Sequence, residues 1–344
     1  MLPTPSGSPT PAAAHLPRVV NIDCNFDYAY ERGRLEAIGA ELVLAKSRTE
    51  DEIIRAAAQA DILVVEGPRT PVTGRVIAAL SRCRAIVKYS VGVDNIDVEA
   101  ATRSGIVVAN AADYCTEEVS DHAVALLLAS ARQVMSMDRR IRAGGWNDFP
   151  SARPMRRMSE LTLGLVGLGR IARATARKMG GFRMRILASD PYLAPGFPEP
   201  GIEVVPLDRL LREADLVSVH VPLTAETRGF IGEQAFGLMK PTAILVNTSR
   251  GGVVDEAALG RALGEKRIAG AALDVMAEEP LPASSPLRGF DQVILTPHQG
   301  SVSTDAMDHV RRTVTDSIEA VLSGRWPPFP VNPQVSPRVP LRRT

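Results

Sequence analysis

Short apolar runs alternate with helical patterns along the first third of the chain. From Arg18 to Val108 the apolar runs are Val19–Ile22, Leu42–Leu44, Ile62–Val65, Ala85–Val87 and Ile106–Val108. The segments between them, such as Glu50–Ala60 and Thr73–Ser81, place apolar residues at three- and four-residue steps. Buried strands that alternate with helices predict parallel strand–helix units, with helices on both faces of the sheet.

A second strand–helix series begins at Leu161. Its strand candidates are Leu161–Val166, Arg185–Ala188, Leu216–His220, Ala243–Asn247, Gly270–Leu273 and Val293–Leu295. Between the two series, the stretch from Thr116 to Ala143 lacks proline and glycine and is followed by Gly144, which predicts one long helix. Another amphipathic helix is expected over Thr304–Leu322. Two such series in 344 residues predict two α/β domains.

Charge and cysteine content exclude several classes of partner. Lys and Arg number 40 against 39 Asp and Glu, so we expect no nucleic acid or charged membrane surface as partner. No apolar run is long enough to span a membrane. Cys24, Cys83 and Cys115 are too far apart in sequence to suggest a zinc or CxxC redox site, and they fit a reducing cytoplasm. A soluble cytoplasmic protein without a bound metal is the expectation.

Both ends of the chain are predicted to be tails. Residues 1–17 are rich in Pro, Ser, Thr and Ala and lack the basic start and apolar core of a signal peptide. We expect this segment to be disordered. Residues 331–344 belong to a Pro-rich stretch that ends in Arg342 and Arg343, and we expect a solvated C-terminal tail there.

A glycine turn predicts a dinucleotide site. Gly167 and Gly169 stand where an apolar strand meets a helix, and Ala172 takes the third small-residue position of the motif. The first glycine permits a tight turn, and the second lets the backbone approach a pyrophosphate. The amides of Arg170 and Ile171 at the start of the helix would then face the phosphates.

An acidic residue at the end of the next strand favours NAD over NADP. Asp190 lies 190 − 169 = 21 residues beyond the second glycine. A carboxylate in this position can accept hydrogen bonds from the adenosine ribose, and it would repel a 2′-phosphate. A glycine turn alone is weak support for a ligand, so the prediction depends on the order strand, turn, helix, strand and Asp.

Three ionisable residues that each follow a strand are the candidate catalytic groups. A guanidinium at Arg250 can hold a carboxylate with two parallel hydrogen bonds, and an imidazole at His298 can move a proton. A carboxylate at Glu279 can favour the protonated form of that ring. Each residue also has a plainer interpretation as a solvated or structural side chain, and His220, which ends a strand too, shows that the position alone does not identify a catalytic histidine.

Six ordered motifs give the chain its resemblance to a known family. They are Val91-Gly92-Val93-Asp94-Asn95-Ile96-Asp97, Gly167-Leu168-Gly169-Arg170-Ile171, His220-Val221-Pro222-Leu223-Thr224, Asn247-Thr248-Ser249-Arg250-Gly251-Gly252, Ala272-Leu273-Asp274-Val275 and Thr296-Pro297-His298. From about Arg18 to Asn332 the chain resembles the NAD-dependent D-2-hydroxyacid dehydrogenases. The resemblance implies a Rossmann-type NAD-binding domain (115–300) inserted into a flavodoxin-like substrate-binding domain (18–114 and 301–330), with a cleft between them.

The resemblance also implies a role for particular residues. His298 would be the acid/base, Glu279 its paired carboxylate and Arg250 the substrate anchor, while His220 would be structural or adjacent to the cofactor. Asp274 would lie near the nicotinamide carboxamide, and Val221 would contact the cofactor through its backbone. The residues expected to bind NAD are Gly167, Gly169, Arg170, Ile171, Asp190, Val221, Thr248, Ser249, Asp274, His298 and Ser301. The residues expected to bind the substrate carboxylate are Ser90, Val91, Gly92 and Arg250.

The expected activity is NAD-dependent interconversion of a D-2-hydroxy acid and its 2-oxo acid by a homodimer. A different class within the same resemblance is an NAD(H)-sensing interaction protein of the kind formed by the C-terminal-binding-protein corepressors. Segment Asp113–Glu118 is similar to bacterial relatives of that branch. Ser301 stands where those corepressors have a tryptophan, which favours the enzyme.

Overall fold

The chain forms two compact units. The computed structural model describes residues 16–24, 26–67, 70–146, 154–194 and 196–343, so most of the tail expected over 1–17 lies outside the described residues. One unit ends at Tyr114 and resumes at Met307, and the other is Cys115–Ala306. The sequence predicts boundaries at 114/115 and 300/301, and the second boundary of the compact units lies six residues later, at 306/307. The second unit is inserted into the first, whose two parts are separated along the chain by all of the second unit.

The first unit is built on a parallel sheet. Its described elements are β1 (Arg18–Ile22), α1 (Ala29–Ala37), β2 (Glu41–Ala45), α2 (Glu50–Ala57), β3 (Ile62–Val65), α3 (Gly74–Ala79), β4 (Ala85–Lys88), α4 (Val98–Arg103), β5 (Val107–Ala109) and most of α11 (Thr304–Leu322). Within the described residues the strand order is β2-β1-β3-β4-β5, and every pair is parallel. This is the flavodoxin-like order that the resemblance implied.

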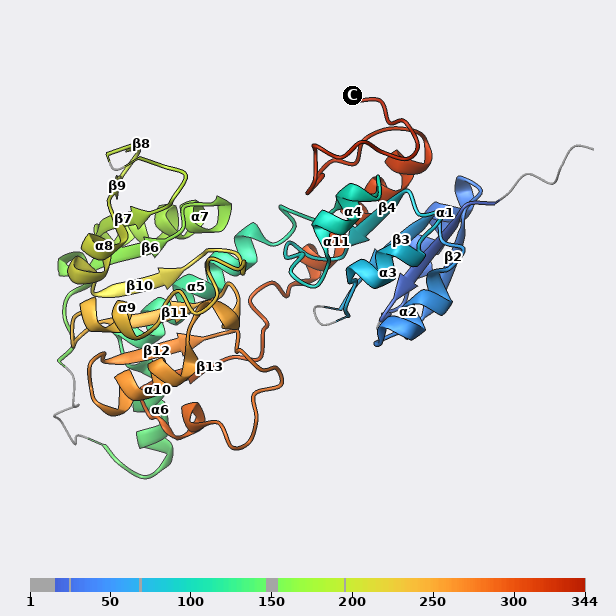
Figure 1. Ribbon diagram of the computed structural model, residues 1–344. Coiled ribbons are helices and arrows are strands. Elements are labelled where there is room, and N and C mark those ends of the chain that lie inside the picture. Colours follow the sequence, from blue (N-terminus) through green and yellow to red (C-terminus); the bar gives the residue numbers. More distant parts are fainter. Residues whose placement is uncertain (1–15, 25, 68–69, 147–153, 195, 344) are drawn as a thin grey trace, which may run out of the picture. The chain divides into compact units, whose positions relative to one another are not determined.

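Helices cover both faces of this first sheet (Figure 1). Ile53, Ile77 and Ala101 of α2, α3 and α4 pack on one face. Leu35 of α1 and Val314 of α11 pack on the other. Since both faces are covered, all residues of β3 and β4 are buried, which explains why these strands are continuous apolar runs.

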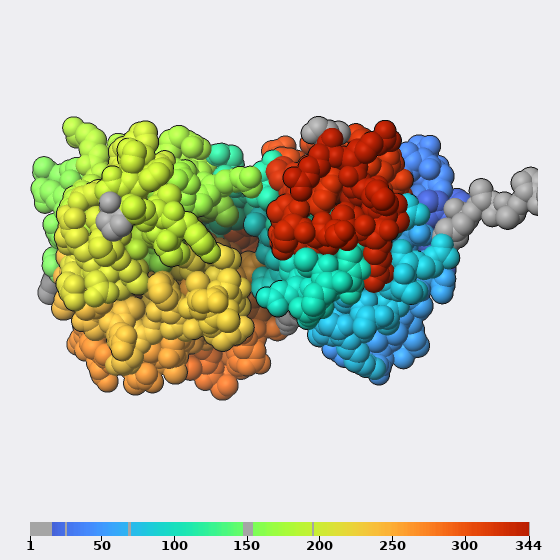
Figure 2. All heavy atoms as spheres, turned by 45° about the horizontal axis from the view of Figure 1, so that its top comes forward, coloured from blue at the N-terminus to red at the C-terminus, as the bar shows by residue number. Residues whose placement is uncertain are grey.

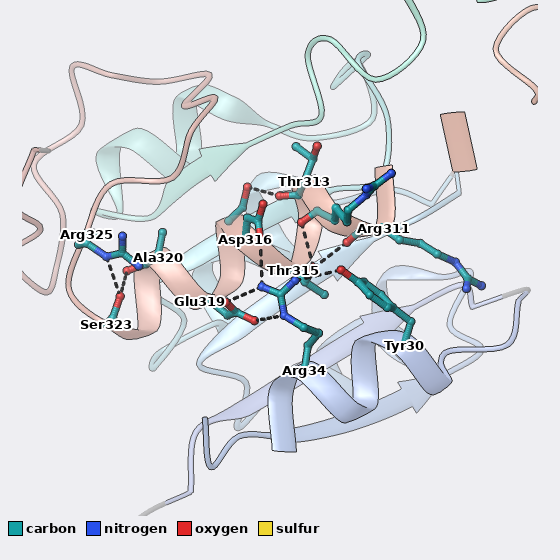
Figure 3. Close-up of polar contacts among 12 residues, drawn as sticks. Tyr30, Arg34, Arg311, Thr313, Thr315, Asp316, Glu319, Ala320, Ser323 and Arg325 are labelled. Atoms are coloured by element: carbon teal, nitrogen blue, oxygen red, sulfur yellow. Dashed lines mark hydrogen bonds and ion pairs between the residues drawn. The ribbon is translucent and has the colours of Figure 1, made fainter. Parts of the chain in front are cut away.

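Arg34 on α1 joins this helix to α11 by hydrogen-bonded ion pairs. Arg34 donates from Nε to Glu319 Oε1 at 2.8 Å and from Nη2 to Glu319 Oε2 at 2.7 Å. The same Nη2 lies 3.0 Å from Asp316 Oδ1. Figure 3 shows the guanidinium of Arg34 between these two carboxylates of α11. The two helices that cover one face of the sheet are therefore also joined by a bidentate ion pair.

The C-terminal segment differs from the solvated tail that we expected, because residues 331–343 pack against the first unit. The side chain of Asn332 is fully buried. Its Oδ1 accepts from the Val108 amide at 2.8 Å, and its Nδ2 donates to Ile106 O at 3.0 Å and to Thr102 Oγ1 at 2.9 Å. Farther along, the Arg338 guanidinium donates to Ser104 O and to backbone carbonyls after α3. Figure 2 shows this segment, in red, spread over the surface of the first unit.

The C-terminal segment packs against the first unit because it completes the backbone hydrogen bonding of β5, the last strand in the order of the sheet. Val331 donates to Val108 O at 2.7 Å, next to the Asn332 contacts. Gly105 makes room for the chain: with φ +68, it has no side chain where a Cβ would lie 3.0 Å from Ser336 O. Arg343 is exposed, as expected, and its guanidinium lies 5.1 Å from the centre of the Trp326 ring.

The second unit contains a larger, mostly parallel sheet. Its described elements are α5 (Thr116–Ala131), α6 (Val134–Arg142), η1 (Met158–Glu160), β6 (Thr162–Val166), α7 (Arg170–Met179), η2 (Gly180–Phe182), β7 (Arg185–Ser189), β8 (Pro198–Glu199), β9 (Ile202–Val204), α8 (Leu207–Glu213), β10 (Leu216–Val219), α9 (Glu233–Leu238), β11 (Ile244–Asn247), η3 (Gly251–Val253), α10 (Glu256–Gly264), β12 (Gly270–Leu273), η4 (Pro286–Gly289) and β13 (Val293–Leu295).

The strand order of this sheet, among the described residues, is β13-β12-β11-β10-β6-β7-β9-β8. All pairs are parallel except β8 with β9. Helices α8, α9 and α10 cover one face and α5 and α7 the other. The chain moves outward from β6 in both directions, so the topological switch point lies between β6 and β10, where ligands bind in such sheets. The predicted fold class, two α/β domains with one of Rossmann type, is confirmed.

Two local features were not anticipated. The single helix expected over Thr116–Ala143 is divided, because Gln133 adopts a left-handed conformation (φ 55) between α5 and α6. Neither proline nor glycine marks this break. It separates the partly buried α5 from α6, none of whose residues is buried. The short strands β8 and β9 were also missed, since two or three residues at a sheet edge carry too little alternation to be recognised.

No helix in the described part of the chain combines the length and the apolar character needed to cross a membrane.

Asn332→Ala is expected to destabilise the first unit. The change leaves the Val108 amide and the Ile106 carbonyl without their buried partner, which costs about 1–3 kcal/mol. Urea unfolding followed by Trp326 fluorescence measures this, in a Trp146→Phe background that leaves a single tryptophan. Exposed Gln334→Ala is the matched control. An unchanged midpoint for Asn332→Ala would show that the hydrogen bonds of this side chain contribute nothing to stability.

Candidate active site

The turn after β6 forms a cradle for an anion. Gly167 has φ +90, and a Cβ there would lie 3.0 Å from His220 O and 2.9 Å from Val221 Cγ1. Only glycine fits this close crossing of two strand ends. Gly169 is the N-cap of α7, and a Cβ on it would meet no atom within 4 Å. Arg170 and Ile171 open the helix, whose first turn has no acidic side chain, so its N-terminus is suited to a phosphate group.

Asp190 is fixed at the end of the neighbouring strand β7. Its Oδ2 accepts from the Leu168 amide of the glycine turn at 2.9 Å. Its Oδ1 accepts from the Tyr192 amide, also at 2.9 Å. The carboxylate is thus held beside the turn by backbone groups on both sides. The cradle and the acid lie together as a dinucleotide requires, and these residues fit NAD(P).

The loop after β11 is shaped by Asn247. Its Oδ1 accepts from the amide of Ser249 at 3.0 Å, and its Nδ2 donates to Arg250 O at 2.9 Å. Arg250 Nη1 in turn donates to Ser249 O at 2.9 Å. Next to them, the buried Thr248 Oγ1 has no hydrogen-bond partner among the described atoms. A buried hydroxyl without a partner is uncommon, and it is consistent with a site for a polar ligand.

Backbone contact brings the loop of Arg250 against the loop of Glu279. Strands β11 and β12 are parallel neighbours, so the loops that follow them leave the same edge of the sheet. A Cβ on Gly251 would lie 1.9 Å from Met276 C and 2.4 Å from Ala277 N. No side chain fits there. Glycine directly after Arg250 therefore permits the two loops to touch, three residues before Glu279.

The imidazole of His298 contacts the carboxylate of Glu279. The Nδ1 atom of His298 lies 2.9 Å from Glu279 Oε2, with the two side chains 34% and 21% exposed. The other carboxylate oxygen, Oε1, accepts from the Met276 amide at 3.1 Å. Since Glu279 occupies Nδ1, the Nε2 atom is the one that His298 can present to a ligand. The imidazole is partly accessible, and it is oriented by a carboxylate that is itself held by the backbone.

Asp274 organises the turn that carries His298. This aspartate is 1% exposed. Its Oδ1 accepts from the Gln299 amide at 2.9 Å and its Oδ2 from the Gly300 amide at 2.8 Å. Its backbone carbonyl accepts from the His298 amide at 2.7 Å. The carboxylate is therefore engaged by the backbone of the turn, and its expected position near the nicotinamide stays a prediction.

The remaining candidate residues are distributed over both units. Val221 lies against Gly167, and Ser301 continues the turn after β13. The substrate-binding candidates Ser90, Val91 and Gly92 follow β4 in the first unit, so the contacts within the second unit do not test their role. Within the described ranges, no group of three or more His, Cys, Asp or Glu residues is arranged to hold a metal ion.

Sequence reasoning missed three residues that shape the site. Asn247 and Thr296 stand inside recognised motifs, but nothing in the spacing showed that their side chains hold the loops. His122 lies on α5, and its Nε2 is 3.0 Å from Thr296 Oγ1. It is 174 residues away in sequence and belongs to no motif, so no signal in the sequence could have paired it with the turn.

Comparison with known proteins gives one family. A profile described as "D-isomer specific 2-hydroxyacid dehydrogenase, NAD binding domain" matches residues 124–300. The chain is 46% identical to the glyoxylate reductase of Korarchaeum cryptofilum over 270 residues, which are 77% of this chain and 81% of the relative. It is 39% identical to the D-3-phosphoglycerate dehydrogenase of Mycobacterium bovis over 82% of this chain, a match that spans only 53% of that relative.

Solved structures agree with this comparison. D-lactate dehydrogenase from Aquifex aeolicus, complexed with NAD and lactic acid, has a TM-score of 0.81 and 26% identity, and the match covers 89% of this chain and 96% of that one. The NADPH-dependent glyoxylate/hydroxypyruvate reductase of Sinorhizobium meliloti, in complex with NADP and malonate, has a TM-score of 0.80 and 30% identity, covering 95% and 99%.

His220 is expected to make the second unit sensitive to acid. Burial lowers the pKa of His220 from 6.5 to about 4, so the folded protein keeps the ring neutral while the unfolded chain takes up a proton near pH 6.5. The neutral ring therefore makes its full contribution to the free energy of unfolding above pH 6.5. That contribution is lost as the pH falls toward 4, and the loss approaches about 3 kcal/mol.

Calorimetric melting between pH 7 and 4.5 measures this effect. The midpoint of the wild type should fall more steeply than that of His220→Gln, whose amide can still bond to Ser218 Oγ, 2.9 Å from the ring nitrogen. His309→Gln removes a histidine that is 47% exposed and serves as the control. Parallel pH curves for the wild type and His220→Gln would contradict the expectation.

Proposed function

Because the chain belongs to the D-isomer specific 2-hydroxyacid dehydrogenase family, we propose that it reduces small 2-oxo acids to D-2-hydroxy acids with NADH and His298 as the acid/base. The family interconverts these two classes of acid with NAD(P), so the chain is an oxidoreductase. The contact of His298 with Glu279, at the carboxyl edge of the NAD(P)-binding sheet, is the observation that carries the assignment of the acid/base.

The chemistry follows from the orientation of the imidazole. Reduction of a 2-oxo acid adds a hydride to the carbonyl carbon and a proton to the carbonyl oxygen, and the bound nicotinamide supplies the hydride. His298 gives the proton from Nε2 while Nδ1 keeps its contact with Glu279 Oε2, which fixes the orientation of the ring. In the reverse direction the neutral ring takes the hydroxyl proton. Reduction therefore consumes the proton that His298 carries, and oxidation returns one to it.

Arg250 is the proposed anchor of the substrate carboxylate. A guanidinium supplies two parallel donors, which fix the position of a planar carboxylate relative to a neighbouring acid/base. The close approach at Gly251 supports this role, because it brings the Arg250 loop against the backbone that leads to Glu279. The Asn247 side chain, bonded to both Ser249 and Arg250, keeps this loop in one conformation.

NAD is proposed as the cofactor in preference to NADP. The carboxylate of Asp190 is fixed beside the phosphate turn by the amides of Leu168 and Tyr192, so it cannot easily swing away from a ribose bound there. Its charge would repel a 2′-phosphate. Similar structures contain either NAD or NADP, so the charge at this position bears directly on the choice of cofactor. The orphan hydroxyl of Thr248 is a further group for the cofactor, since it lies buried without another partner.

One assay tests the activity and the cofactor together. NADH oxidation by the full chain is measured with glyoxylate, hydroxypyruvate, pyruvate and phosphohydroxypyruvate, and then repeated with NADPH. At least one of these acids is expected to be reduced, with kcat/KM more than about 10-fold higher for NADH because of the charge on Asp190. Equal rates with NADPH would overturn the cofactor assignment. Tight NADH binding without turnover of any acid would favour the NAD(H)-sensing alternative.

Variants of His298 identify the acid/base in the same assay. His298→Gln is expected to lower kcat by roughly 10²–10⁴-fold, because a glutamine cannot transfer the proton. NADH affinity, measured by fluorescence, should stay within about threefold of the wild type, since the cradle is unchanged. His309→Gln is the matched control. Retention of normal kcat by His298→Gln would remove this residue from the proposed mechanism.

A homodimer that uses α6 is the proposed assembly. None of the residues of α6 is buried within its unit. Val134, Met135 and Ile141 are 51%, 40% and 48% exposed, and Trp146 beyond the helix is 74% exposed. Apolar side chains gathered on one helix indicate a surface that another molecule covers, and a second copy of this chain is the proposed occupant.

Sedimentation equilibrium at micromolar concentration tests the assembly. The wild type is expected to be a dimer and Ile141→Glu a monomer, because the charge would be buried at the interface. Ile38→Glu changes an equally exposed isoleucine in the first unit and should leave the dimer intact. A monomeric wild type, or an Ile141→Glu variant that remains dimeric, would contradict the proposed surface.

A further inference from the structure

The backbone of His298 is held in an unfavourable conformation. Its φ is +56, in the left-handed region that a residue with a side chain rarely adopts because its Cβ crowds the backbone. Such a conformation persists when its surroundings fix the backbone on several sides. The contacts of the turn from Thr296 to Gly300 therefore determine whether the imidazole points at Glu279.

Asp274 supplies most of these contacts but also depends on a side chain outside the turn. Its Oδ1 accepts from Thr296 Oγ1 at 2.6 Å in addition to the backbone amide of Gln299. On the other side of Thr296, His122 of α5 brings its Nε2 to 3.0 Å from the same hydroxyl. The same Nε2 is 3.3 Å from Asp274 Oδ1. The three side chains form a continuous polar chain from the helix to the turn.

The direction of these hydrogen bonds can be assigned. Both oxygens of Asp274 already accept backbone amides, so the carboxylate is an acceptor here. The hydroxyl of Thr296 has one proton, and it must donate that proton to Asp274. The remaining contact then requires His122 to donate from Nε2, which places its proton on that nitrogen. A side chain with a donor at the position of Nε2 is thus needed on α5.

The packing leaves little room for a substitute. A Cβ on Gly300 would lie 2.9 Å from Asp274 Oδ2 and 3.4 Å from His122 Cδ2. Gly300 is buried, and α5 packs against β11 and β12 beneath the turn. Figure 1 shows α5 alongside these strands of the second unit. His122 is therefore in direct contact with the turn and connects it to α5.

We propose that His122, acting through Thr296 and Asp274, is a positioning residue that holds the His298 turn in its left-handed conformation. This inference rests on the proposed acid/base role of His298 for its effect on catalysis. Its effect on the backbone of the turn is independent of that role. Loss of the Nε2 donor leaves the Thr296 hydroxyl with one partner fewer, and the carboxylate that receives the amides of Gln299 and Gly300 is held less firmly.

Matched pairs of variants test the donor separately from packing. His122→Gln retains an amide donor close to the position of Nε2, and His122→Met has a similar length without a donor. Thr296→Ser retains the hydroxyl, and Thr296→Val removes it at nearly constant volume. We expect His122→Met and Thr296→Val to lower kcat about 10–100-fold, because a small displacement of a catalytic group is costly. KM should change less than about threefold, and the Gln and Ser variants should retain most of the activity.

The double variant His122→Met/Thr296→Val should be no slower than the slower single variant, since both changes break the same chain. Equal losses of kcat in the Gln and Met variants, with matching decreases in melting temperature, would show that His122 only fills space, and would overturn the proposal.

Hydrogen exchange of the amides of Gln299 and Gly300 gives a readout that does not need turnover. In the full chain, His122→Met should exchange these amides roughly 10-fold faster than the wild type, and His122→Gln should not. Unchanged exchange in His122→Met would overturn the proposal even if His298→Gln abolished activity. Accelerated exchange together with a normal kcat for His298→Gln would support the positioning chain and contradict the acid/base role, so the two failures are distinguishable.

Discussion

The common direction of the strands in the second sheet is the constraint on which the site depends. Strands β11, β12 and β13 are parallel neighbours, so the loops that follow them all leave the sheet at one edge. Antiparallel strands would send alternate loops to opposite edges. The parallel arrangement gathers Arg250, Glu279 and His298 on adjoining loops although they are far apart in sequence. The same edge carries the glycine turn after β6 and Asp190 after β7, which is why a cofactor cradle and the contact of His298 with Glu279 occur on one face of one unit.

The buried carboxylate of Asp274 then fixes the detailed geometry of the turn that carries His298. An unpaired carboxylate as buried as Asp274 would be strongly unfavourable, so it needs donors on both oxygens. The turn after β13 supplies them from its backbone and from Thr296. The same hydrogen bonds therefore supply donors to the buried carboxylate and fix the conformation of the turn. His298 adopts its left-handed backbone within that arrangement, and Glu279 orients the ring from the neighbouring loop.

In the first unit, segments that are far apart in the sequence complete one core together. One face of its sheet is covered by α1 and by α11, and most of α11 follows the second unit in the sequence. Asn332 then bonds to Val108, which is 224 residues earlier in the sequence. The first unit therefore cannot complete its core or its backbone hydrogen bonds until the last part of the chain is present. Residues 331–343 are a structural part of this unit.

Much of the architecture followed from local pattern. The continuous apolar strands, the amphipathic α11 and the glycine turn are each specified by residues close together in sequence, because strand burial, helix amphipathicity and tight turns depend on near neighbours. The break at Gln133 and the packing of the C-terminal segment were not recognisable, since both depend on partners elsewhere in the fold. Pro-rich composition suggested a tail after residue 330, and only the contacts of Asn332 and Arg338 showed that the segment is packed.

For the site, the order of residues along the chain was sufficient to show which chemical groups follow which strands, and hence the family, the NAD(P)-binding sheet and the candidates Arg250, Glu279 and His298. The packed fold was needed to show which of these groups touch: the 2.9 Å contact of His298 with Glu279, the crossing of loops at Gly251 and the support of the His298 turn by His122. The reason is physical. Hydrogen bonds and steric contacts act over a few ångströms in space, and residues separated by 174 positions meet only when the packed sheet and helices bring their backbones together.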